Sequence, residues 1–165
     1  METAVIIPVP EAAPTVARHR WTHDPTSALG IPEHITLLGP FVEPDVGVER
    51  ALANIFATAP AFAFQLARTG WFGNQVLYLA PEPAAPFIAL THRLVAKFGV
   101  KPYRGEFADV IPHLTVAQEN GTPELEAQLL PALPIDARAV EAWLMVQPVA
   151  EGGWIRHLRL PLTRT

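Results

Sequence analysis

The chain has 165 residues, of which 50% are hydrophobic and 17% charged, as expected for one globular domain spanning residues 1–165 and not for a disordered chain. It contains no cysteine, which excludes disulfides, thiol nucleophiles and thiolate metal sites. The formal net charge of −4 argues against a broad electrostatic grip on long duplex nucleic acid, so a nucleic-acid partner should be small or bound at one end.

The amino terminus lacks the basic region of a signal peptide, and no run reaches the ~18 apolar residues needed to span a bilayer. We therefore expect a cytoplasmic protein without a membrane partner.

In the first part of the chain, residues 3–9 form a predicted buried strand, and a predicted helix runs from Pro14 to Trp21. Residues 33–42 form a second predicted strand, closed by Gly39-Pro40. Asp45 is suited to cap a fourth element, a helix whose apolar residues recur at helical spacing: Val48, Leu52, Ile55 and Phe56.

Two further strands are predicted over residues 62–66 and 75–79, joined by a turn over residues 70–74. A second strong helix is indicated by apolar residues at helical spacing: Phe87, Leu90, Leu94 and Phe98. Residues 99–112, which contain glycine and proline, are expected to form an irregular loop.

The remaining elements are a strand that begins at His113, a short helix from Thr122-Pro123 to Leu130, and strands over residues 135–147 and 154–160. This order, with its hairpins, predicts an α+β fold built on antiparallel sheets.

Two of these strands carry the same pattern, histidine–apolar–threonine–apolar, at residues 34–37 and 113–116. Because side chains alternate along a strand, the histidine and threonine of each segment share one face and the apolar residues share the other. Each motif strand is followed by a helix and a hairpin, which indicates an internal repeat. We expect two antiparallel-sheet lobes with flanking helices, related by a pseudo-twofold axis around a central cleft.

Paired histidines suit a reaction that removes a proton at one side of a centre and donates one at the other, such as phosphodiester transesterification or the opening of a cyclic phosphate. With an ordinary pKa near 6.5, histidine supplies both the base and the acid near neutral pH. We assign these roles to His34 and His113, and expect Thr36 and Thr115 to donate hydrogen bonds to phosphate oxygens. Nothing in this chemistry requires a metal ion or another cofactor.

The two segments resemble the paired His-x-Thr-x motifs of the two-histidine (2H) phosphoesterase superfamily, and most closely those of bacterial 2'-5' RNA ligase-like proteins. The order of elements and the loop that contains Tyr103 and Arg104 are similar as well. The resemblance implies a bilobal fold and metal-independent action on 2',5'-linked or 2',3'-cyclic phosphates of RNA ends or small nucleotides. Tyr103 is a candidate for stacking on a base or for packing, and Arg104 is the cation nearest to a motif in sequence.

Several alternatives stay open. The two strands could carry histidine and threonine only on solvated faces, or the site could hold zinc with a third ligand from His19, His23 or Asp24. The same cleft could bind a nucleotide or an RNA terminus without turning it over, or the protein could have a purely structural role. Trp71 and Phe72 could line the cleft, but packing in the core or between the lobes is the favoured interpretation. The four other histidines are expected to be structural: His19, His23, His92 and His157.

Overall fold

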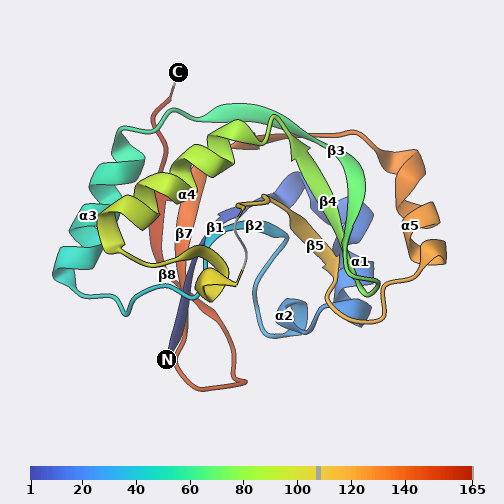
Figure 1. Cartoon of the computed structure of the whole chain (residues 1–165), viewed down its shortest axis with the longest axis horizontal. Coiled ribbons are helices and arrows are strands. Elements are labelled where there is room, and N and C mark those ends of the chain that lie inside the picture. The colour runs from blue at the N-terminus through green and yellow to red at the C-terminus, as the bar shows by residue number, and fades with distance from the viewer. Residues whose placement is uncertain (107–108, 165) are drawn as a thin grey trace.

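Two four-stranded antiparallel sheets form the framework of the protein in this computed structural model, which describes residues 1–106 and 109–164 (Figure 1). The first sheet has the strand order β2 (His34–Leu38), β1 (Glu2–Pro8), β7 (Glu141–Gln147) and β8 (Ile155–Pro161). The second has the order β5 (Leu114–Ala117), β4 (Val76–Glu82), β3 (Phe62–Phe72) and β6 (Ile135–Ala139). The predicted α+β fold is confirmed.

The four predicted helices occur in the expected order, together with a short helix over Pro25–Ala28 that was not predicted. They are α1 (Ala13–His23), α2 (Pro25–Ala28), α3 (Val46–Ala57), α4 (Ala85–Phe98) and α5 (Pro123–Leu129), with short 3-10 turns at Pro10–Ala12, Pro102–Gly105 and Leu130–Ala132. As predicted, Asp45 caps α3: its carboxylate accepts the backbone N–H of Val48 at 2.8 Å. None of the helices in the described parts of the chain is long and apolar enough to cross a membrane.

The two halves of the chain are interleaved. Helix α1 follows β1 of the first sheet but packs against β5 of the second, and α4 follows β4 of the second sheet but packs against β2 of the first. The hydroxyl of Thr91 on α4 fixes this packing by donating to the backbone carbonyl of Leu37 at 2.7 Å. Figure 1 shows α3 and α4 beside the first sheet and α1 and α5 beside the second.

The structure corrects three predicted strand boundaries. The strand predicted over residues 135–147 is two strands: β6 pairs with β3 of the second sheet, and β7 pairs with β1 of the first. The exposed Val140 lies between them, where the chain passes from one sheet to the other. The strand predicted over residues 62–66 continues to Phe72, because β4 supplies a hydrogen-bonding partner as far as that residue. The strand predicted over residues 33–42 is shorter, since β2 covers only residues 34–38 and ends directly before Gly39-Pro40.

Strand β1 is buried on both faces. Val5 and Ile7 belong to the main hydrophobic core, which extends through both sheets and the long helices. On the opposite face, Ala4 and Ile6 form a small second cluster with Ile31 and Met145, against which Trp143 and Trp154 pack. This division arises because successive side chains of a strand point to opposite faces of the sheet. Ile6 pairs with Thr36, so the second cluster lies on the face of the first sheet that carries Thr36.

Candidate active site

Both motif strands are edge strands, and β2 of one sheet contacts β5 of the other at the centre of the molecule. His34 begins β2, and His113 directly precedes β5. The apolar residues of each motif are buried, while the histidine and threonine are half-buried on the other face. All four polar residues line one cavity of about 450 Å³: His34, Thr36, His113 and Thr115. The two histidines to which the sequence analysis assigned the acid and base roles therefore face the same cavity.

The two imidazoles are held in the same way. Nδ1 of His34 lies 2.7 Å from the carbonyl oxygen of Pro32, and Nδ1 of His113 lies 2.6 Å from that of Ile111. A carbonyl oxygen only accepts, so Nδ1 of each ring carries the proton and donates it. The neutral ring then has its lone pair on Nε2, which is the atom available for exchanging a proton with a ligand.

Burial keeps both rings neutral near pH 7. It lowers the pKa of His34 to about 4, with further lowering by the charges of Arg20 and His113, against opposing effects of the Pro32 carbonyl and Asp24. Burial also lowers the pKa of His113, and the hydrogen bond to Ile111 opposes this shift.

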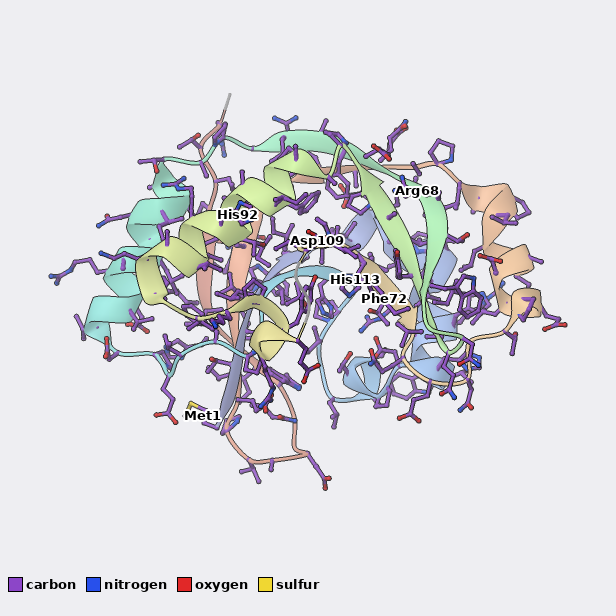
Figure 2. The ribbon with its side chains drawn as sticks, viewed as in Figure 1. Met1, Arg68, Phe72, His92, Asp109 and His113 are labelled. Carbon is purple, nitrogen blue, oxygen red and sulfur yellow. The ribbon has the colours of Figure 1, made fainter. Side chains whose placement is uncertain are left out.

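Three aromatic rings surround His113. The ring centroid of Phe72 lies 4.8 Å from that of His113 in an edge-to-face arrangement, and those of Tyr78 and Tyr103 lie at 5.4 and 6.5 Å. Figure 2 shows Phe72 and His113 side by side near the centre of the molecule. Phe72 therefore follows the less favoured of the two interpretations, because its ring lines a hollow of about 300 Å³ next to His113.

Tyr103 has a positioning contact that its place in the sequence did not indicate. Its hydroxyl donates to the carbonyl of Ile111 at 3.1 Å and accepts from the N–H of Ile111 at 3.3 Å. The same carbonyl accepts from His113, so Tyr103 holds the peptide group that holds the imidazole. The Tyr103 ring also lines two hollows beside His113. Arg104 lines the cavity shared by His34 and His113, and its guanidinium lies 3.3 Å from the carboxylate of Glu2.

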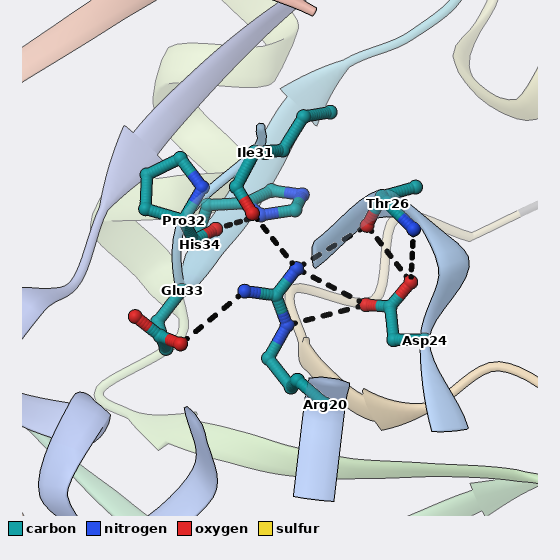
Figure 3. A network of polar contacts seen from close by, with 7 residues as sticks. All are labelled: Arg20, Asp24, Thr26, Ile31, Pro32, Glu33 and His34. Atoms are coloured by element: carbon teal, nitrogen blue, oxygen red, sulfur yellow. Dashed lines mark hydrogen bonds and ion pairs between the residues drawn. The ribbon is translucent and has the colours of Figure 1, made fainter. Parts of the chain in front are cut away.

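Sequence reasoning missed a buried charged network behind His34 (Figure 3). Arg20 of α1 is 1% exposed and is paired with Asp24 at 3.2 Å and Glu33 at 3.4 Å. It also donates to the carbonyl of Ile31 at 3.1 Å and to the hydroxyl of Thr26 at 3.2 Å. These contacts fix the segment directly before His34, including Pro32. Two features of the sequence could have indicated this network: Arg20 and Asp24 lie one helical turn apart, and a glutamate directly precedes the first motif.

The remaining candidates have structural contacts or lie on the surface. Trp71 donates its indole N–H to Glu126 at 3.0 Å, as fits the expected packing role. His92 is exposed on α4, and His157 lies 2.5 Å from Glu49. Asp24, a possible zinc ligand, accepts instead from Arg20 and Thr26. Across residues 1–106 and 109–164, no three His, Cys, Asp or Glu side chains are grouped to hold a metal ion.

Comparison with known proteins agrees with this arrangement. The model of the 2'-5' RNA ligase superfamily matches residues 8–150. The structure is similar to E. coli LigT complexed with 3'-AMP, with a TM-score of 0.63 and 22% identity over 98% of both chains. It is also similar to a crystal structure titled phosphoesterase, with a TM-score of 0.60 and 21% identity over 98% of both chains. TT0787 of Thermus thermophilus has a TM-score of 0.62 and 18% identity, again over 98% of both chains.

The comparison with curated proteins found no match. The superfamily model nevertheless spans most of the chain, including both motif strands and the helices between them. The structural neighbours share the same two-sheet architecture over nearly the whole of their own length. The chain therefore belongs to the 2'-5' RNA ligase superfamily, the 2H phosphoesterases.

Proposed function

We propose that this protein is a metal-independent phosphodiesterase or transesterase that acts on 2',5'-linked or 2',3'-cyclic phosphates of RNA ends or small nucleotides. The observation that carries the proposal is the matched tethering of the two imidazoles: each Nδ1 donates to a carbonyl two residues earlier, and both rings line one cavity. This arrangement leaves two Nε2 atoms for proton exchange at one anionic centre. The whole chain acts as one unit, because strands from both of its halves contribute to each sheet.

In the opening of a 2',3'-cyclic phosphate, water attacks phosphorus while neutral His34 removes a proton from the water at Nε2. The bond between phosphorus and one ribose oxygen breaks, and protonated His113 donates a proton to that oxygen. The low pKa of His34 suits it to the base role, because the ring stays neutral across the physiological range. The bound phosphate anion favours the protonated form of His113 and so opposes the effect of burial.

Thr36 and Thr115 donate hydrogen bonds to the non-bridging phosphate oxygens in this scheme. Each hydroxyl lies two residues after a catalytic histidine on the same strand face, and both residues line the shared cavity. Their side chains therefore face the charge that develops as the bond to phosphorus forms.

The size of the cavity and the ligands of structural neighbours support a small nucleotide or an RNA end as the substrate. Crystal structures of E. coli LigT contain 3'-AMP, phosphate, NADP+ or ATP. A cavity of about 450 Å³ is of the size that holds small-molecule ligands, which fall at ~300–1,000 Å³.

The test is an assay of the purified protein with 2',3'-cyclic mononucleotides and short 2',5'-linked oligonucleotides, with product analysis by chromatography. We expect turnover by the wild type and a loss of ~100-fold to 10,000-fold in His34→Ala and in His113→Ala, with the thermal stability nearly unchanged. His92→Ala, an exposed position on α4, is the control and should keep full activity. Full activity in either single motif variant would overturn the proposal.

The second candidate is a binding module that captures a nucleotide or an RNA terminus in the same cleft. It is favoured less, because both histidines and both threonines are intact and face one cavity. Tight binding of the cyclic nucleotides without any product in the same assay would identify this role.

A further inference from the structure

We propose that the catalytic cleft continues across the open face of the first sheet as a binding surface for single-stranded RNA, formed by Trp143, Trp154, Arg156 and Arg159 (the Trp–Arg face). This inference rests on the proposed function, and it extends the substrate from a small nucleotide to the end of an oligonucleotide. The Trp–Arg face would contact the nucleotides that precede the reacting phosphate.

A row of paired residues runs from the catalytic cavity to this surface. Thr36 on β2 pairs with Ile6 on β1, Ile6 pairs with Trp143 on β7, and Trp143 pairs with Arg159 on β8. Residues opposite each other in an antiparallel sheet share a face, so these four side chains lie on one side of the sheet. With strands ~4.8 Å apart, Arg159 lies roughly 14 Å from Thr36, which is the span of a few nucleotides.

The next row along the same face brings a second arginine beside the tryptophans. Ala4 pairs with Met145, and Met145 pairs with Arg156. The guanidinium of Arg156 lies 4.9 Å from the centre of the Trp143 ring. This cation–π contact restrains the arginine side chain and leaves its N–H groups free of a carboxylate among the residues that the structure describes, so they can donate to a phosphate group.

The charges on this face favour a polyanion at Arg156 in particular. Arg159 has a carboxylate beside it, that of Glu141 at 2.6 Å, which offsets part of its charge. Among residues 1–106 and 109–164, no carboxylate is paired with Arg156, whose side chain is exposed.

The surface is continuous with the catalytic cavity. Ala4, Ile6 and Trp154 line that cavity together with the four motif residues. A chain whose terminal phosphate lies between the two histidines therefore meets half-buried tryptophan rings and then the guanidinium of Arg156. Aromatic rings interleaved with arginines are the surface that single-stranded RNA binds, by base stacking and phosphate contacts.

The experiment compares kcat/KM for a 2',3'-cyclic mononucleotide with kcat/KM for a ten-nucleotide RNA that ends in a 2',3'-cyclic phosphate, in the wild type and in Arg156→Glu. Arg50→Glu makes the same change in net charge on α3, which packs against the opposite face of the first sheet, and is the matched control. Arg156→Ala removes the contact between the guanidinium and a phosphate without adding a negative charge, so it distinguishes loss of that contact from repulsion of the RNA by the new glutamate. Circular dichroism melting checks that every variant is folded.

We expect the wild type to prefer the ten-nucleotide RNA and Arg156→Glu to reduce the ratio of the two kcat/KM values about tenfold, with Arg50→Glu unchanged. The slope of log KM for the RNA against log salt should also fall by ~0.7 in Arg156→Ala, the loss of one phosphate contact. An unchanged ratio in Arg156→Glu, or a wild type without preference for the longer RNA, would overturn this inference. Failure of the wild type to turn over either substrate would instead overturn the proposed function.

Discussion

The guanidinium of Arg20 lies 3.4 Å from the carboxylate of Glu33, the residue directly before His34 (Figure 3). This contact links helix α1, which packs on the second sheet, to the start of the motif strand in the first sheet. A buried charge pair of this kind adds little net stability compared with an apolar pair, but removal of one partner is costly because the other charge is left buried.

Arg20→Met should therefore lower the free energy of unfolding by about 3–5 kcal/mol, since Asp24 and Glu33 keep buried negative charges. Arg20→Lys should lose less, because the positive charge remains. Denaturant unfolding measures both effects. The lost positive charge should also raise the pKa of His34, so that the acid limb of kcat/KM moves to higher pH. A stable Arg20→Met variant with an unshifted pH profile would exclude this positioning role.

The lowered pKa of His34 makes the folded state less stable in acid. The folded pKa of about 4 lies below the ordinary value of 6.5, so the unfolded chain binds this proton first as the pH falls between the two values. The stability lost through this residue approaches about 3 kcal/mol at the acid end of that window. Urea unfolding at about pH 7 and about pH 4.5 should show a smaller loss in His34→Gln than in the wild type.

His92→Gln is the control for this pH dependence, because His92 is exposed on α4 and the variant should keep the wild-type difference between the two pH values (Figure 2). If His34→Gln loses as much stability as the wild type on acidification, the shifted pKa of His34 is not the cause.

The hydroxyls of Thr36 and Thr115 should matter more than the size of these side chains. We expect Thr36→Val and Thr115→Val to lower kcat/KM by about 10-fold to 100-fold, as is typical for a lost hydrogen bond to a charged group, and the serine variants to keep most of the activity. Steady-state kinetics on a 2',3'-cyclic nucleotide measures kcat/KM for the valine variants, which lack the hydroxyl, and for the serine variants, which keep it. Equal activity of valine and serine variants would argue against phosphate contacts by these residues.

The absence of a side chain at Gly70 leaves room for the ring of Tyr78 beside His113. A Cβ atom at position 70 would overlap the ring of Tyr78, which packs 5.4 Å from the imidazole. Gly70→Ala should therefore lower the free energy of unfolding by about 1–3 kcal/mol and reduce turnover by displacing Tyr78 against His113. Gly153→Ala is the matched control, because its Cβ would meet only the Leu29 carbonyl at 3.8 Å. Equal melting temperatures and activities in the two variants would contradict this account.

Catalysis by the two imidazoles alone predicts resistance to chelators. Activity on a 2',3'-cyclic nucleotide should be unchanged after incubation with EDTA and dialysis, and added zinc or magnesium should not increase it. A loss of activity that either ion restores would show that a metal takes part in the reaction.

The local pattern of hydrophobic residues was sufficient to predict the strands and the helix around the site. Alternation at residues 34–37 and 113–116 correctly predicted two strands with an apolar buried face, and helical spacing after Asp45 correctly predicted α3. Such patterns are readable because the period of a strand or a helix is set by the backbone of that segment alone. The division at Val140 was not readable, because both β6 and β7 have strand character and only long-range pairing assigns them to different sheets.

By itself, the sequence determined the α+β class, the two His-x-Thr-x faces and the chemistry that these side chains can perform. Only the tertiary structure decided that a carbonyl fixes each imidazole, that Arg20 is buried behind His34, and that Phe72 and Tyr78 pack on His113. The reason is physical: the partners that bury and pack these side chains come from distant strands and helices. The burial that lowers the two histidine pKa values exists only once the two sheets have come together.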